Sequence, residues 1–138
     1  MFSTWLYSSV CTLDRAEAGE AMRAIQAVSQ SRNATLDVTG ALIWTGERYS
    51  QFIEGPAASV AALRQSILSD PRHRGALTLE ASTAARRAFA GWWAVSSAGT
   101  SFFERELKRI CEQAGTRAED SARDLKALLM EFVRTTDR

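Results

Sequence analysis

Two runs of strand-forming residues, 39–45 and 48–54, are separated by only two positions, the first of which is a glycine. So short a connection is typical of an antiparallel hairpin, and the two runs are therefore expected to pair in a sheet. Because side chains alternate along a strand, Gln51 is expected to share one face with Tyr49 and Ile53. Its carboxamide both donates and accepts hydrogen bonds, so Gln51 could exchange partners beside a polar ring.

The segments around this hairpin predict an alternation of strands and helices. In order, we expect a strand over 2–10, a helix capped by Asp14 and running to about Ser31, the hairpin, a helix opened by Gly55–Pro56 and stopped by Pro71, and strands over 75–81 and 89–96. Because strand–helix–strand crossovers are right-handed, this βαββαββ order predicts an α+β, ferredoxin-like sheet with two helices on one face. Capping-box spacing at 101–104 and 116–119 predicts two further C-terminal helices.

The length of 138 residues suits a single domain. Residues 1–97 are expected to form its core, and residues 98–138 a helical extension of the same domain that serves output or dimerisation. The 17 basic and 16 acidic residues leave a net charge of +1, which predicts no nucleic-acid partner.

Localisation is predicted from what the chain lacks. No apolar run is long enough to span a membrane, and the first residues have neither the basic region nor the long apolar stretch of a signal peptide. Cys11 and Cys111 stand alone, which favours a reducing cytoplasm over a disulfide framework. With a single histidine and no paired cysteines, a structural zinc site is not expected.

Six short motifs, in this order, resemble those of the BLUF family, blue-light sensors that use flavin, over residues 2–97. The motifs are Tyr7–Ser9, Ser29–Asn33, Thr39–Leu42, Gln51–Gly55, Asp70–His73 and Phe89–Trp92. No single motif is decisive, but their order and spacing together are specific. The resemblance implies a photoreceptor that is not an enzyme and that binds one non-covalent flavin, FAD with FMN as the other possibility.

The resemblance also implies the site residues. The photochemical residues would be Tyr7, Gln51 and Trp92; in the family, light moves an electron and a proton from the tyrosine to the flavin and back, leaving the glutamine rearranged. The flavin-binding residues would be Tyr7, Ile25, Val28, Ser29, Arg32, Asn33, Gln51, Ile67, Asp70, Arg72 and His73. Asn33 would pair with the ring's N–H and carbonyl groups, and the ring would lie between the apolar side chains of the two helices.

The chain departs from the family pattern at three places. Ala94 stands where the family usually has a methionine, so either Trp92 or Trp93 fills the space or the output strand is coupled differently. Arg32 is cationic where many relatives carry a neutral side chain. The stretch from Tyr7 to Asn33 is about two residues longer than usual, an insertion that we place before the first helix.

Other interpretations of the same residues remain open. Taken singly, Gln51 is an ordinary strand residue, Tyr7 a core residue and Asn33 a helix terminus. The chain could be a flavin-free protein-interaction module on the same fold, or a small hydrolase, although it lacks a nucleophile–base pair and a phosphate-binding glycine loop. The partners expected of the photoreceptor are a downstream signalling protein and a second copy of the chain in a homo-oligomer.

Overall fold

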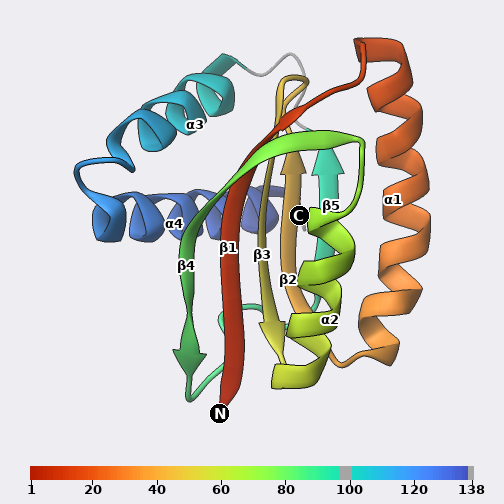
Figure 1. The fold of residues 1–138 in the computed structure, drawn as a ribbon, viewed down its shortest axis with the longest axis vertical. Helices are drawn as coiled ribbons and strands as arrows, with labels where there is room; N and C mark the ends of the chain where they lie inside the picture. Colours follow the sequence, from red (N-terminus) through yellow and green to blue (C-terminus); the bar gives the residue numbers. More distant parts are fainter. Residues whose placement is uncertain (97–100, 137–138) are drawn as a thin grey trace.

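The computed structural model describes residues 1–96 and 101–136, in which one five-stranded sheet has helices on both faces (Figure 1). The elements are β1 (Phe2–Cys11), α1 (Arg15–Thr35), β2 (Thr39–Trp44), β3 (Arg48–Gly55), α2 (Ala57–Leu68), β4 (His73–Ala84), β5 (Trp92–Ser96), α3 (Ser101–Gln113) and α4 (Ala118–Thr136). The strands lie in the order β4-β1-β3-β2-β5.

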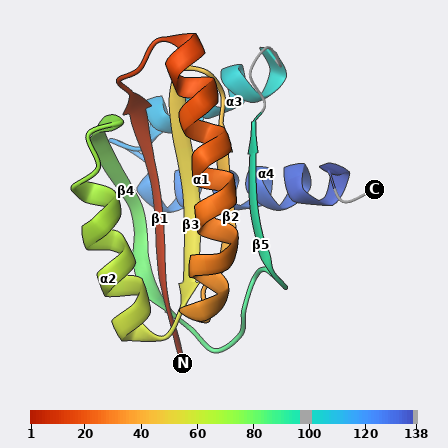
Figure 2. The ribbon, with the colours of Figure 1, turned by 90° about the vertical axis from the view of Figure 1, so that its right-hand side faces the viewer.

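The sheet confirms the α+β, ferredoxin-like prediction. β3 pairs antiparallel with both β1 and β2, whereas β5 joins the edge of β2 in parallel. Figure 2 shows α1 and α2 together on one face and α4 behind the sheet, where it crosses the strands. The two helices of the strand–helix–strand units therefore share a face, as right-handed crossovers require.

Alternation along the strands divides the interior into two cores. On the α1/α2 face, Trp5, Tyr7 and Leu42 pack with residues of both helices. On the α3/α4 face, Leu6 and Phe52 pack against the apolar rows of the C-terminal helices, including the fully buried Leu125 and Leu129. Neighbouring strand residues thus belong to different cores, which is the period-two pattern expected of a sheet buried on both faces.

The first helix is longer than the sequence indicated. α1 continues past Ser31 to Thr35, so the predicted end near Ser31 is wrong and Asn33 lies within the helix rather than after it. No proline or glycine interrupts this last turn, and the helix ends only where the Leu36 N–H bonds back to Arg32 and Asp37 adopts a left-handed φ of 58°.

The fourth and fifth strands also differ from their predicted bounds. β4 begins at His73 rather than Gly75 and runs to Ala84, because β1 offers it partners from Cys11 back to Phe2. β5 begins at Trp92 rather than Phe89, whose N–H instead bonds to a carboxylate of β3. Pro56 lies just before the first residue of α2 rather than in its first turn.

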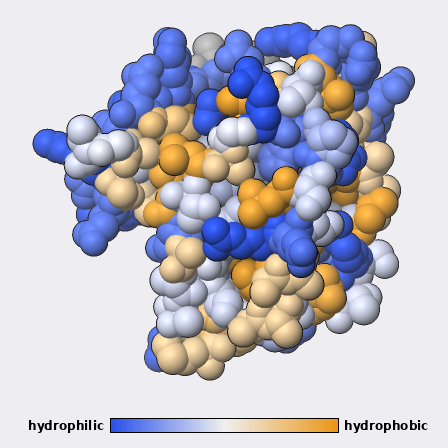
Figure 3. All heavy atoms as spheres, viewed as in Figure 1, coloured by the Kyte–Doolittle hydropathy of each residue, from blue (hydrophilic) through white to orange (hydrophobic). Residues whose placement is uncertain are grey.

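The face drawn in Figure 3 shows hydrophilic and hydrophobic residues intermixed. Large apolar side chains that are exposed lie on different elements, among them Leu68 on α2, Leu77 on β4 and Met130 on α4. Among the described helices, none combines the length and the apolar character that a membrane crossing needs.

Candidate functional site

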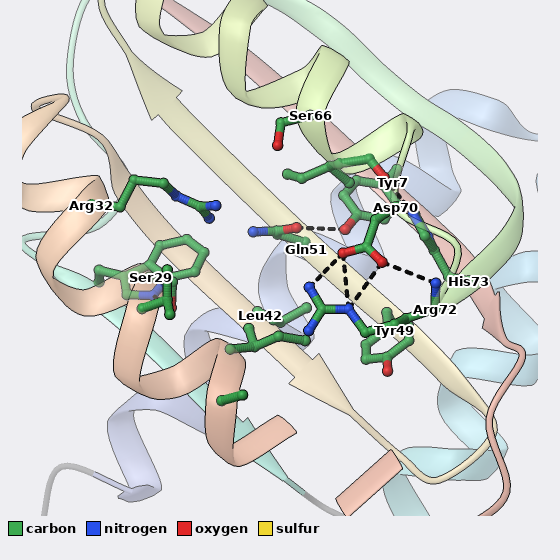
Figure 4. Close-up of a pocket in the computed structure, with 15 residues that line it drawn as sticks. Tyr7, Ser29, Arg32, Leu42, Tyr49, Gln51, Ser66, Asp70, Arg72 and His73 are labelled. Carbon is green, nitrogen blue, oxygen red and sulfur yellow. Dashed lines mark hydrogen bonds and ion pairs between the residues drawn. The ribbon is translucent and has the colours of Figure 1, made fainter. Parts of the chain in front are cut away.

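A cavity opens on the sheet between α1 and α2, with about 750 Å³ of unfilled space including its mouth. Its lining consists of Tyr7, Ala24, Ile25, Val28, Ser29, Arg32, Leu42, Tyr49, Gln51, Ser66, Ile67, Asp70, Arg72, His73 and Trp92. Figure 4 shows these side chains converging from both helices and from the strands below them. Apolar walls with a few polar groups are typical of a site for a flat organic ligand.

Tyr7 and Gln51 form the centre of the cavity floor. They lie opposite each other in the β1–β3 ladder and on the same face, and the Tyr7 hydroxyl donates to Gln51 Oε1 at 2.5 Å. The two residues are only 3% and 4% exposed, and burial, with the nearby Asp70 carboxylate, raises the pKa of Tyr7. The phenol is therefore held neutral and aimed at a group that can change partners.

Among the described residues, Tyr7 is the one hydrogen-bond partner of the Gln51 side chain, so the other half of the carboxamide can serve a ligand. Its N–H₂ group extends away from Tyr7 and toward the Arg32 side of the cavity (Figure 4). A half-turn of the amide would present nitrogen to the phenol and oxygen to the ligand, which would reverse donor and acceptor on both sides. This arrangement can exist in two hydrogen-bonded states.

Asn33 carries a buried donor with no partner. The residue is fully buried, and its Nδ2 makes no hydrogen bond within the described residues, while its Oδ1 accepts from Arg32 Nε at 3.3 Å. An unpaired buried amide is costly, so a ligand carbonyl at this position would be well matched. Asn33 adjoins Arg32 at the cavity rather than lining it. The orphaned amide and the flat apolar walls together fit a flavin ring.

The mouth of the cavity is cationic. Arg72 holds Asp70 through Nε at 2.9 Å, and this bond lowers the pKa of Asp70 and raises that of Arg72. Burial and repulsion from Arg72 lower the pKa of Arg32. Two guanidiniums against one carboxylate leave a positive balance, suited to a phosphate or an electron-rich ring edge.

His73 connects two elements below the mouth. Its Nδ1 bonds with Ser9 Oγ at 2.7 Å and its Nε2 with the Ile67 carbonyl at 2.6 Å. Since both ring nitrogens are occupied, neither is available as a base without rearrangement. The histidine holds the start of β4 against the end of α2, and its ring packs near Tyr7 and Tyr49.

The two tryptophans of β5 face opposite sides. Trp92 lines the cavity and donates from Nε1 to Ser29 Oγ at 2.9 Å, whereas Trp93 packs with the α3/α4 core. Ala94 follows on the Trp92 side, and its carbonyl accepts from Gln26 Nε2 of α1 at 2.7 Å. Of the two tryptophans, Trp92 is therefore the one beside the position where the family usually has methionine.

The structure brings the predicted site residues together, with Asn33 beside the cavity and the others in its lining. Their contact with a flavin stays a prediction. Sequence reasoning missed Ala24, Leu42, Tyr49 and Ser66. Tyr49 and Leu42 could have been found, because alternation puts Tyr49 on the Gln51 face and the hairpin register pairs Leu42 with Gln51. Within residues 1–96 and 101–136, no three histidine, cysteine or acidic side chains are grouped to hold a metal.

Comparison with known proteins gives one consistent result. Residues 2–95 match the family BLUF, described as sensors of blue-light using FAD. The blue light- and temperature-regulated antirepressor BluF of Escherichia coli (strain K12) is 30% identical over 107 residues, which are 78% of this chain and 25% of that protein. The photoactivated adenylate cyclase subunit beta of Euglena longa is 32% identical over 77 residues, 56% of this chain and 9% of that protein.

Among solved structures, BlrB, a BLUF protein in its dark state, has a TM-score of 0.71 at 27% identity, over 93% of this chain and 97% of that one. The present chain thus spans a quarter or less of the two curated relatives but nearly all of BlrB.

Proposed function

This chain belongs to the BLUF family of blue-light sensors, and from that membership we propose that its cavity holds FAD non-covalently and that Tyr7 and Gln51 switch its state. The observation that carries the proposal is the buried Tyr7–Gln51 hydrogen bond on the cavity floor. When bound, the flavin would supply the absorption of blue light and a one-electron oxidant in its excited state. The protein's own residues would supply orientation and a hydrogen-bond network with two arrangements.

The proposed switch uses the geometry of Tyr7 and Gln51. Tyr7 would give one electron to the excited flavin, and its hydroxyl proton would leave along the bond to Gln51 toward the ring edge; both would return when the phenol is restored. While the proton is away, the Gln51 amide loses its donor and is free to turn. A photon shifts the population only if the new arrangement is itself hydrogen-bonded, which the two-sided carboxamide allows.

The other lining residues are proposed to hold the ring and its tail. Ile25 and Val28 would cover one side of the ring and Ile67 the other, and Val28 is 59% exposed where it faces the cavity region. Asn33 would pair with the polar edge of the ring. Arg32 and Arg72 would bind the edge or a phosphate, which favours a dinucleotide or mononucleotide over riboflavin.

Purification tests this proposal directly. The protein should be yellow, and illumination should shift the flavin absorption to longer wavelength, reversing in darkness. Extraction and mass measurement of the pigment should give FAD. A colourless protein that does not take up added FAD or FMN would exclude the photoreceptor and leave the flavin-free interaction module. Extracted FMN would overturn only the choice of cofactor.

Replacing Ala94 by methionine should change the dark recovery. Ala94 pairs with Leu42 of the cavity lining and is partly buried on the same face, so a longer side chain would press on the site. We expect a change of at least about threefold in the recovery rate, roughly 0.7 kcal/mol in barrier height. Flash-induced absorption changes followed in darkness measure it. Recovery and partner binding both equal to wild type would contradict a role for this position.

We propose that the output is a protein contact and that the chain is not itself an enzyme. Residues 98–138 would form the output or dimer region of the same domain as the sensor core, residues 1–97, in a homo-oligomer located in the cytoplasm. The named relatives include an antirepressor and a cyclase subunit, which supports a regulatory partner without identifying it. Affinity capture in light and in darkness, followed by mass spectrometry, should give a partner whose yield depends on illumination.

A further inference from the structure

Trp5 stacks on the residue that the proposed switch oxidises. The ring centroids of Trp5 and Tyr7 lie 4.3 Å apart with an interplanar angle of 23°. Both side chains point to the α1/α2 face of β1, and Trp5 is only 1% exposed. An indole in van der Waals contact with an oxidised phenol is a ready one-electron donor.

A cation lies over this indole. The guanidinium carbon of Arg64, from α2, is 5.0 Å from the centroid of the Trp5 ring. Among the described residues no carboxylate lies within ion-pair distance of Arg64, so its charge is not neutralised by a neighbour. The attraction between a guanidinium and a neutral ring becomes repulsion when the ring itself is positive.

The indole proton also has no base to accept it. Trp5 Nε1 donates to the Thr78 hydroxyl at 3.0 Å, and a threonine hydroxyl is too weak a base to take the proton. An oxidised Trp5 would therefore stay positively charged beside Arg64.

We propose that Arg64 keeps the oxidising equivalent on Tyr7 by opposing the oxidation of Trp5. This inference rests on the proposed function, in which Tyr7 is the electron donor. In the step that Arg64 opposes, Trp5 loses one electron and oxidised Tyr7 gains it. The phenol then takes back the proton that it shared with Gln51, while Trp5 remains one electron short. Tyr7 is thereby restored by Trp5 early, which shortens the time in which the Gln51 amide lacks its donor and can turn. Arg64 is a positioning residue that acts through Trp5.

The test is Arg64→Met, which keeps much of the side-chain bulk and removes the charge. Transient absorption of the flavin-loaded protein should show a tryptophan radical raised on the order of tenfold, the size expected for a partly screened charge at this distance. The yield of the red-shifted form should fall accordingly. Arg64→Lys keeps a cation and should stay near wild type. In the double variant Trp5→Phe with Arg64→Met, the yield should recover, because phenylalanine is not oxidised.

Recovery in the double variant separates this role from a structural one. If Arg64 only supported the fold, adding Trp5→Phe to Arg64→Met would not restore the yield of the red-shifted form. An unchanged radical signal and yield in Arg64→Met would overturn the proposal, as would a loss of yield that the double variant does not rescue.

A second readout needs no flavin, so that a failure of flavin binding is distinguishable. Azidyl radicals made by pulse radiolysis oxidise tryptophan and tyrosine in the flavin-free chain, and Trp5→Phe identifies the share of the signal due to Trp5. Arg64→Met should raise that share and Arg64→Lys should not. Equal shares in wild type and Arg64→Met would overturn the inference even if the protein bound no pigment.

Discussion

Gln51→Leu is expected to abolish the light-induced red shift while the protein remains yellow. Leucine has nearly the same volume but no donor or acceptor, so the Tyr7 hydroxyl loses the group to which it is bonded. No second arrangement is then available for light to populate. The signal should fall below about a hundredth of the wild-type amplitude, because a missing hydrogen-bond partner removes the switch rather than weakening it. Difference spectra recorded before and after illumination measure this amplitude.

The matched control is Gln65→Leu, the same change at an exposed position on α2 that is outside the cavity lining. Its difference spectrum should equal that of wild type. Flavin content and unfolding midpoint, measured for both variants, show whether each protein is folded and loaded. A folded, flavin-loaded Gln51→Leu protein that still shows the full red shift would contradict the proposed role of Gln51.

The sheet could be predicted because its signals are local. The two-residue connection of the hairpin fixes the register in which Gln51 pairs with Leu42, and alternation then assigns each strand residue to a face. The same alternation accounts for Trp92 and Trp93, which belong to the cores on opposite faces of the sheet. Periodicity therefore gives the face of each strand residue, whereas the family resemblance was needed to assign Tyr7, Gln51 and Trp92 to one site.

Element ends could not be predicted in the same way, because they depend on partners far away in sequence. β4 extends to Ala84 because Phe2 is there to pair with it, and no residue within 75–81 indicates this. Asn33 belongs to a helix that continues to Thr35, where the chain turns toward β2. The polar residues near Ser31 indicated an earlier end of this helix. The stacking of Arg64 on Trp5 joins α2 to β1, and nothing in either segment alone predicts it.

Glu54→Ala is expected to cost roughly 3–5 kcal/mol of unfolding free energy, because the carboxylate is fully buried and accepts three hydrogen bonds. The backbone N–H groups of Ala88 and Phe89 each donate to it at 2.8 Å, and Thr39 Oγ1 donates at 3.0 Å. The carboxylate thus fixes the loop before β5 to the α3/α4 face of β3. Alanine leaves these donors without a partner inside the protein and adds a cavity.

Two variants show whether the acceptor oxygens of Glu54 are the cause. Glutamine has nearly the same shape as glutamate, but one of its two oxygens is replaced by an N–H₂ group, which would face a hydrogen-bond donor. We therefore expect Glu54→Gln to lose less unfolding free energy than Glu54→Ala, about 1–3 kcal/mol. Glu47→Ala removes an exposed glutamate from the hairpin turn and should change the free energy by less than about 0.5 kcal/mol. Urea unfolding of the wild type and the three variants, each with its flavin bound, gives these differences in unfolding free energy. Equal stability of Glu54→Ala and Glu47→Ala would mean that the loop before β5 is held by Phe89 packing against Phe52 and Trp93 instead.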